Sequence, residues 1–352
     1  MATTRLLTTA EVAVRLGISP RTVVRMVEDG ELPATTTQGG HRRIAETEVE
    51  SYLARRGHAA PTGAITLAVA NQKGGVGKTT LTANLGVLLH QLGARVLLVD
   101  LDPQGHLTFT MGLDPDGLTQ TIYDAMLTPR AVPIDNVIVA TGFGPDLAPI
   151  NLVAADADTE FGNKPMWGGF LAKVLAGVRE RYDYILIDSA PNLGKLTVTA
   201  FMTADWLIVP TQPQMLSIRG LQLLLERIDE ARSDANAQLQ IAGAVPMMMQ
   251  TTNADQTMDQ ALRRALNIRA IRVFRNAIPY STVYKEAANA RSIQAYLAPQ
   301  SKHTTPYRLL LAEILAVVGG PAAAQLKLDL TAATGVPASA APALVGGDPY
   351  GA

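Results

Sequence analysis

The chain has 352 residues, of which 47% are hydrophobic and 17% charged, a balance typical of globular proteins and a length sufficient for two domains. It contains no cysteine, which excludes disulfides, thiolate metal sites and a cysteine nucleophile and fits a reducing compartment. A net charge of −1 excludes a globally basic nucleic-acid binder, and the lack of a long apolar run or a signal-peptide pattern favours a cytoplasmic protein without a membrane span.

The first 55 residues have the pattern of a compact helical unit. A helix is predicted over Thr9–Leu16, with Thr8 as its N-cap and Glu11 three positions later, which is the pattern of a capping box. Residues 17–20 form a turn that ends in a proline suited to the start of a helix, and a second helix is predicted over Arg21–Asp29. Two short helices at this spacing indicate a helix-turn-helix.

Two more elements complete this unit. Residues 35–44 contain paired glycines and predict a hairpin or wing, and Thr47–Leu53 predicts a closing helix. The unit resembles the MerR/excisionase type of winged helix-turn-helix in the stretches LTTAEVAVRLGISPRTVVRMVEDGELP and GGHRRI. The resemblance implies that the second helix enters the major groove and the wing contacts the DNA backbone. The DNA contacts it implies are Arg21, Thr22, Arg25, Arg42 and Arg43.

The local charge of this unit supports DNA binding only weakly. Eight arginines up to residue 56 face seven acidic residues, so groove binding would depend on one basic face. The alternative interpretation is a small helical module for dimerisation or partner docking.

A linker at 56–64, with Pro and Gly among small residues, separates this unit from a large region at 65–318. Continuous apolar runs, typical of strands buried on both faces, alternate there with helical segments and predict an α/β fold with a mostly parallel sheet covered by helices on both faces. The predicted strands are 65–70, 95–100, 184–188, 206–210 and 240–246. Residues 319–352 are rich in Ala, Gly and Pro, and we expect a mostly disordered tail.

The segment Asn71–Thr80 is the most specific signal in the chain. It lies between the first predicted strand and a helix predicted over Leu81–Leu92, which is the context of a phosphate-binding loop. Glycines let backbone N–H groups approach a polyphosphate, the lysine supplies a charge for its β- and γ-phosphates, and the hydroxyl that follows can bind Mg²⁺. The predicted nucleotide-binding residues are Gly74, Gly75, Val76, Gly77, Lys78, Thr79 and Thr80.

Two strands of the predicted sheet end in a carboxylate. Asp100 and Asp188 follow apolar runs, and Asp102 comes two residues after the first of them. A buried carboxylate without a partner is costly, and Mg²⁺ with its waters is the natural partner beside a phosphate loop. The alternative interpretation is an aspartate that caps the helix after each strand.

Three motifs in this order resemble the ParA/MinD family of deviant Walker A ATPases: KGGVGKT, LLVDLDPQG and YDYILIDSAPNLG. The resemblance implies a P-loop NTPase fold, with ATP and Mg²⁺ as cofactors. Lys73 would reach across an ATP-dependent homodimer to the partner's nucleotide, and the implied catalytic set is Lys73, Lys78 and Asp102. Asp102 would orient the attacking water, and the metal would be held by Thr79, Asp100 and Asp188, partly through water. Ser189-Ala190 departs mildly from the family pattern.

A local basic excess lies near the end of the large region. Residues 262–318 contain nine Lys or Arg and two Glu, which gives nine minus two, or +7. Such an excess is typical of polyanion binding, and the family resemblance implies non-specific DNA as the polyanion. The candidate contacts are Arg272, Arg275 and Arg291. The alternative is a set of solvated helix faces whose acidic partners lie elsewhere in the fold.

The expected function is that of a partitioning ATPase with an added DNA-binding domain. The resemblance implies a cytoplasmic, nucleoid-associated protein that dimerises on ATP, binds DNA and is cycled by a ParB-like partner to segregate plasmid or chromosome DNA. The helix-turn-helix adds specific, autoregulatory DNA binding as a hypothesis. Positioning of a protein cargo and an ATP-switched transcriptional regulator remain alternatives. A membrane-associated regulator of the MinD kind is disfavoured, because the tail has Lys327 as its single basic residue.

Overall fold

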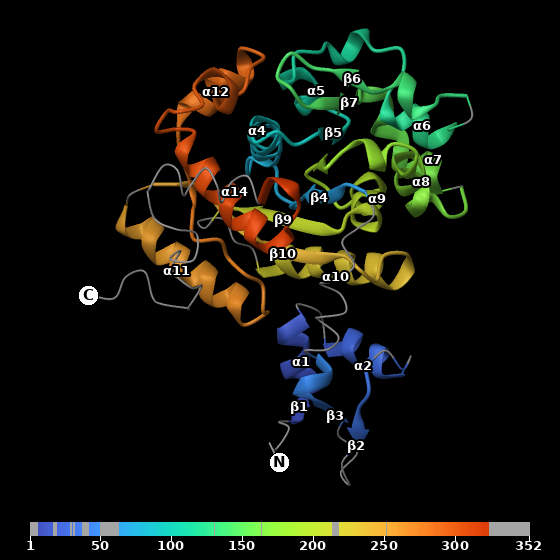
Figure 1. Cartoon of the computed structure of the whole chain (residues 1–352), viewed down its shortest axis with the longest axis vertical. Helices are drawn as coiled ribbons and strands as arrows, with labels where there is room; N and C mark the ends of the chain where they lie inside the picture. The colour runs from blue at the N-terminus through green and yellow to red at the C-terminus, as the bar shows by residue number, and fades with distance from the viewer. Residues whose placement is uncertain are drawn as a thin grey trace.

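The computed structural model describes residues 6–16, 20–28, 30, 32–36, 42–49, 63–129, 131–162, 164–212, 218–250 and 252–323 (Figure 1). Most of the expected closing helix over 47–53, most of the linker and the tail from residue 324 lie outside these residues. Within them, no helix combines the length and apolar character needed to cross a membrane.

The first unit has the predicted helix-turn-helix elements and a small antiparallel sheet. Its elements are β1 (Leu6–Thr8), α1 (Thr9–Leu16), α2 (Pro20–Glu28), β2 (Thr35–Thr36) and β3 (Arg42–Ala45). Strands β2 and β3 pair as the two arms of the predicted wing, and β1 pairs with the other edge of β3. The predicted capping box is confirmed, because the backbone N–H of Glu11 donates to the Thr8 hydroxyl at 3.1 Å and the Thr8 N–H donates to the Glu11 carboxylate at 2.8 Å. Leu7 of β1, Val23 of α2 and Ile44 of β3 belong to one hydrophobic core.

An eight-stranded sheet forms the second unit (Figure 1). Its order is β11-β10-β9-β4-β8-β5-β7-β6, and every pair is parallel except β6 with β7. The strands are β4 (Ile65–Val69), β5 (Val96–Leu101), β6 (Val139–Ala140), β7 (Asp146–Ala148), β8 (Tyr184–Ser189), β9 (Trp206–Thr211), β10 (Gln240–Met249) and β11 (Ile278–Pro279). The five predicted strands are confirmed within a few residues. The short strands β6, β7 and β11 were not predicted.

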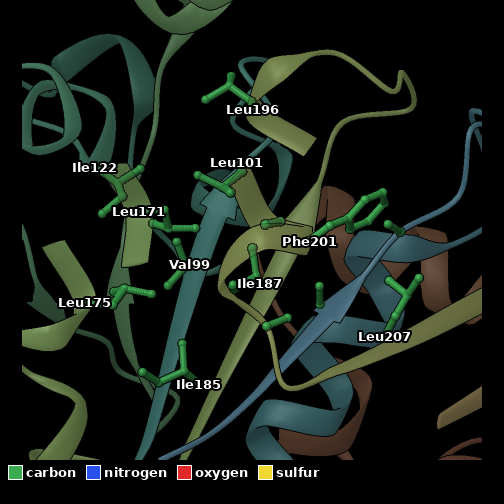
Figure 2. Packing of buried hydrophobic residues seen from close by; sticks show 14 of the residues in the cluster. Val99, Leu101, Ile122, Leu171, Leu175, Ile185, Ile187, Leu196, Phe201 and Leu207 are labelled. Carbon is green, nitrogen blue, oxygen red and sulfur yellow. The ribbon is translucent and has the colours of Figure 1, made fainter. Parts of the chain in front are cut away.

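The continuous apolar runs are explained by burial on both faces of this sheet. Leu97, Val99 and Leu101 of β5 point into one core, and Val96 and Leu98 point into the other, as the alternation of a strand requires. Figure 2 shows Val99 and Leu101 packed beside side chains of β8 and of the helices that cover the first face. The sheet is therefore held on both sides, which fixes the ends of its strands.

Helices cover both faces. On one face lie α4 (Lys78–Gln91), α5 (His106–Thr110), α12 (Thr282–Asn289), α13 (Gln294–Leu297) and α14 (Thr305–Val318). On the other lie α6 (Ile122–Leu127), α7 (Ala157–Gly162), α8 (Phe170–Ala176), α9 (Lys195–Thr203), α10 (Ile218–Asp234) and α11 (Asn253–Asn267). Helix α4 begins at Lys78, three residues before the predicted start, because the chain turns into the helix directly after Gly77.

Residues on both sides of the expected boundaries of this unit pack against it. Before β4, Ala64 is buried and its N–H donates to the carbonyl of Arg179 at 3.0 Å. After α14, the Tyr184 hydroxyl donates to the carbonyl of Gly319 at 2.9 Å, and Ala322 is buried. Residues 319–323 thus contact the start of β8, and a side chain at Gly320 would collide with Tyr184.

A polar cluster ties the start of β4 to its neighbours. The carboxylate of Asp205 accepts the backbone N–H of Thr66 at 2.8 Å and pairs with the Arg179 guanidinium, which also donates to the Ala64 carbonyl at 3.0 Å. The Asp205 and Arg179 side chains are 30% and 28% exposed, so their loss would leave partly desolvated groups without partners.

We expect Asp205→Ala to lower the free energy of unfolding by about 1–3 kcal/mol, because the Thr66 N–H loses its acceptor and Arg179 loses its ion-pair partner. The matched control is Asp135→Ala, which removes a more exposed pair with Arg181 and should cost less than about 1 kcal/mol. Urea unfolding of both variants measures the difference, and equal losses would contradict this account.

Candidate nucleotide site and nucleic-acid surfaces

The phosphate loop connects β4 to α4 in a conformation that needs glycine. Gly75 and Gly77 have φ angles of 74° and 89°, in the left-handed region that disfavours other residues. A side chain at Gly77 would also meet the terminal methyl of Met247 at 2.8 Å, so this methionine side chain would have to move. The Asn71 amide donates to the carbonyl of Pro210 at 2.7 Å and fixes the loop against the end of β9.

The two lysines of the loop differ in their surroundings. Lys78 is buried, and its Nζ donates across the loop to the Lys73 carbonyl at 3.2 Å. Burial lowers the pKa of Lys78, although the charges of Asp188 and Asp102 partly oppose this. A phosphate group would compensate its desolvated charge. The Lys73 side chain is half-buried and takes no part in that hydrogen bond, which uses only its backbone.

The strongest indication of a metal lies between α4 and β8. The Thr79 hydroxyl donates to Asp188 Oδ2 at 2.6 Å, while Oδ1 of the same fully buried carboxylate has no hydrogen-bond partner in the described structure. Burial raises the pKa of Asp188 well above its usual range, and the nearby charge of Asp100 adds to the shift. A buried carboxylate oxygen without a donor, beside a hydroxyl, fits Mg²⁺ bound directly or through water.

Asp100 lies next to Asp188 on the neighbouring strand, and the two residues are paired in the sheet register. Its Oδ2 accepts both the N–H and the hydroxyl of Thr108 at 2.8 Å, and its Oδ1 accepts the N–H of Asp102 at 3.1 Å. Burial raises the pKa of Asp100 to about 7. Both oxygens of Asp100 thus accept hydrogen bonds from the loop and helix that follow β5. Of the two roles expected for Asp100, these contacts favour support of the loop over binding of the metal.

Asp102 lies at the rim of the site and is 6% exposed. Its Oδ1 accepts the N–H of Gln104 at 3.1 Å, and its Oδ2 is 4.0 Å from Nδ1 of His106. One oxygen is therefore fixed by the backbone, and the other is free of any close donor among the described residues. A carboxylate held in this way can accept a proton or a hydrogen bond from a water molecule.

A cavity of about 710 Å³ is lined by Lys78, Thr79 and Asp102, and Asp188 is connected to it through its hydrogen bond with Thr79. The loop, Asp102 and Pro191 form one side of it, and residues far along the chain form the other. That second side includes Met247, Met248, Ile278, Pro279, Tyr280, Tyr284, Lys285 and Tyr307. The sequence motifs do not predict these residues, because they lie far from the phosphate loop in the sequence and are brought beside it only by the folding of the sheet. A second cleft, of about 780 Å³, lies beside Arg95 and Tyr182 and is lined by none of the predicted nucleotide-binding, catalytic or metal-binding residues.

The expected DNA contacts of the first unit lie on two elements. Arg25 is exposed on α2, and Arg42 on β3 pairs with Glu28 of α2 at 2.7 Å. That pair ties the wing to the second helix. Arg43 donates to the carbonyl of Arg42 at 3.2 Å. Arg21 and Thr22 belong to α2, and their side chains lie outside the described atoms.

The basic excess near the end of the second unit is smaller than the count of charges indicates. Arg263 pairs with Asp259 of the preceding turn at 2.7 Å, an acidic partner outside the counted range. Arg272, Arg275 and Arg291 are all exposed. The backbone carbonyl of Arg272 accepts the N–H of Ala244 in β10, so its side chain projects from a fixed position at the sheet.

Comparisons with known proteins agree with this geometry. Residues 64–241 match a family model described as an AAA domain, and residues 6–57 match a helix-turn-helix domain. The chain is 32% identical to the sporulation initiation inhibitor protein Soj of Bacillus subtilis, over 71% of this chain and 98% of Soj. It is 36% identical to the chromosome partitioning protein ParA of Caulobacter vibrioides, over 53% of this chain and 71% of that protein.

A solved structure shares both fold and sequence. The cobyrinic acid a,c-diamide synthase of Mycobacterium smegmatis, with bound ATP analog and magnesium, is 32% identical and superposes with a TM-score of 0.64 over 72% of this chain and 94% of that one. The phosphate loop, the paired strand-end carboxylates and these similarities agree. The chain belongs to the ParA/Soj family of P-loop ATPases and carries a helix-turn-helix domain before its ATPase domain.

Proposed function

We propose that this protein is a partitioning ATPase that uses Mg²⁺-ATP to alternate between DNA-bound and free states. The observation that carries the proposal is that Lys78 and Thr79 line one cavity, while the Thr79 hydroxyl donates to Asp188, whose other buried oxygen lacks a donor in the described structure. In this arrangement Lys78 would neutralise the phosphates, and Thr79 and Asp188 would hold Mg²⁺. The metal would supply charge neutralisation at the phosphates.

Asp102 would act on the attacking water. Its Oδ1 is held by the Gln104 N–H, so its Oδ2 can accept a hydrogen bond from water at the rim of the cavity. Phosphoryl transfer depends mainly on positioning and charge neutralisation, so one fixed carboxylate oxygen is sufficient for this role.

ATP would also join two copies of the chain. The side chain of Lys73 is half-buried and is not used to bind Lys78, which contacts only its backbone. It can therefore extend to a nucleotide on a second copy. A sandwich dimer of this kind would place a positive charge from each copy at the other's phosphates.

The dimer would bind DNA without sequence preference through its exposed arginines, Arg272 and Arg275 in particular, and thereby associate with the nucleoid. A single copy offers few such groups, so joining two copies raises the affinity by bivalency. A partner that stimulates hydrolysis, of the ParB kind, would release the dimer. The names of the relatives, a chromosome partitioning protein among them, support DNA as the cargo.

The helix-turn-helix domain would read a specific DNA site. Its second helix presents the exposed Arg25, and the Arg42–Glu28 pair holds the wing at a fixed position beside that helix. A footprint over the DNA upstream of the protein's own gene tests this hypothesis of autoregulation. Protection without a preferred site would contradict it. This domain also favours an ATP-switched transcriptional regulator as the second candidate function.

We expect the two loop lysines to fail at different steps. Lys78→Ala should weaken ATP binding at least roughly 100-fold, because it removes the buried charge that faces the phosphates. Lys73→Ala should change ATP binding by less than roughly fivefold but abolish ATP-dependent dimerisation, because its backbone still supports Lys78. Calorimetry of ATP binding and light scattering of the ATP-bound protein separate the two, and a dimeric Lys73→Ala variant would exclude the proposed cross-contact.

Asp102→Ala should trap the ATP-bound state, since it removes the carboxylate assigned to the water but no phosphate contact. We expect hydrolysis to fall by roughly 100-fold or more with ATP affinity retained. The trapped protein should bind random-sequence duplex DNA with ATP, but not with ADP or without nucleotide. Fluorescence anisotropy in the three conditions measures this. Binding that is equal in all three would assign the DNA contact to the helix-turn-helix domain and favour the transcriptional regulator.

Reversal of one exposed charge should weaken non-specific binding. Arg272→Glu is expected to reduce the affinity of the ATP-bound protein for random duplex roughly 5- to 20-fold and to lower the slope of log affinity against log salt by about one. Lys173→Glu, an exposed position on α8, makes the same change of charge elsewhere and is the control. A salt titration by anisotropy gives both quantities, and equal effects of the two variants would show that only net charge matters.

A further inference from the structure

Helix α5 contacts both the catalytic carboxylates and the basic segment near the end of the ATPase domain. Thr108 gives two hydrogen bonds to Asp100, and its hydroxyl also accepts the N–H of Ile150 at 3.2 Å. The helix starts at His106, directly after the loop that carries Asp102. A displacement of this helix would therefore move the groups that position both Asp100 and Asp102.

The next residue on α5 contacts an arginine from a distant segment. The guanidinium of Arg291 lies over the ring of Phe109, 4.4 Å from the ring centroid. Phe109 also lines the nucleotide cavity. Within the described part of the chain, the guanidinium of Arg291 forms no ion pair with a carboxylate, so the ring is its nearest identified partner.

The backbone around Arg291 directs this contact. Arg291 has a φ angle of 50°, in the left-handed region that a non-glycine residue seldom adopts. Four residues later, the N–H of Ala295 donates to Asn84 of α4 at 3.0 Å, and its carbonyl accepts the Gln91 amide at 3.0 Å. The segment is thereby anchored to the helix that follows the phosphate loop, while the side chain of Arg291 is exposed and reaches across to α5.

The contact is weak enough to be exchanged. A cation–π interaction at an exposed site is among the weaker contacts of arginine, whereas a phosphate can accept two parallel, charge-assisted hydrogen bonds from the same guanidinium. A DNA phosphate next to this surface would therefore compete successfully with the ring for Arg291. Loss of the arginine would remove a restraint from Phe109 and from the helix that holds Asp100.

We propose that the Arg291–Phe109 contact restrains α5 in the DNA-free protein, and that DNA phosphates release this restraint and raise the rate of ATP hydrolysis. This regulation rests on the proposed function, because it requires that DNA reach Arg291. Arg291 is a positioning residue here, since it acts on the carboxylates through Phe109 and Thr108.

The test compares ATP hydrolysis by full-length wild type, Phe109→Leu and Phe109→Tyr at saturating ATP and Mg²⁺, with and without random-sequence duplex DNA. Leucine removes the ring, so the DNA-free rate should rise roughly 3- to 10-fold and DNA should add less than roughly twofold. Tyrosine keeps the ring and should retain the wild-type response to DNA. Arg291→Ala should show the raised DNA-free rate together with weaker DNA binding.

The DNA-free rate tests the restraint independently of DNA binding. A wild-type rate and a wild-type response to DNA in Phe109→Leu would overturn the inference and leave the proposed function intact. Lack of DNA binding by the ATP-bound wild type would overturn the proposed function at this surface, and a raised DNA-free rate in Phe109→Leu would then still support the restraint. By linkage, Phe109→Leu should bind DNA at least as tightly as wild type, and weaker binding would count against the exchange.

Discussion

Burial of charge at the ends of two adjacent strands is the constraint on which the rest of the structure depends. Asp100 and Asp188 have no solvent exposure, and Lys78 across from them is 6% exposed. Burial opposes the charged form of all three groups, which raises the pKa values of the carboxyls and lowers that of the lysine. The site is therefore incomplete without ligands that restore the lost solvation. A divalent cation would compensate the negative charge of the two carboxylates, and a polyphosphate would compensate the positive charge of Lys78.

Packing of the sheet offsets the free-energy cost of burying these charges. Apolar side chains on both faces of β5 and β8 are packed between layers of helices, as Figure 2 shows for one face, so the strands cannot move apart to hydrate their ends. Hydrogen bonds from Thr79 and Thr108 then satisfy part of each carboxylate. What remains unsatisfied, Oδ1 of Asp188, lies where a metal would bind. Core packing and ligand binding are thus linked through Asp100 and Asp188, which lie at the ends of the packed strands.

Much of this could be predicted from local patterns in the sequence. Continuous apolar runs indicated the strands, and glycines before Lys78 indicated the loop. Both patterns lie within a few consecutive residues, so they can be recognised without knowledge of the fold. The far side of the cavity, which includes Met247 and Tyr307, could not be predicted, since it is brought to the loop by the order of strands in the sheet. Short edge strands such as β6 and β11 have two residues each and carry no periodicity. The pairing of Arg263 with Asp259 likewise shows that a count of charges cannot identify which arginines are available.

The contact of Met247 with Gly77 has a consequence for recombination between related chains. Met247 belongs to the end of β10, and its terminal methyl occupies the space that a side chain on the phosphate loop would need. The segment that matches the AAA family model ends at residue 241, before this methionine. A chimera that exchanged only residues 64–241 would therefore combine one parent's loop with the other parent's covering residue. The two sides of the nucleotide cavity would then come from different parents, because about 170 residues of chain separate Gly77 from Met247.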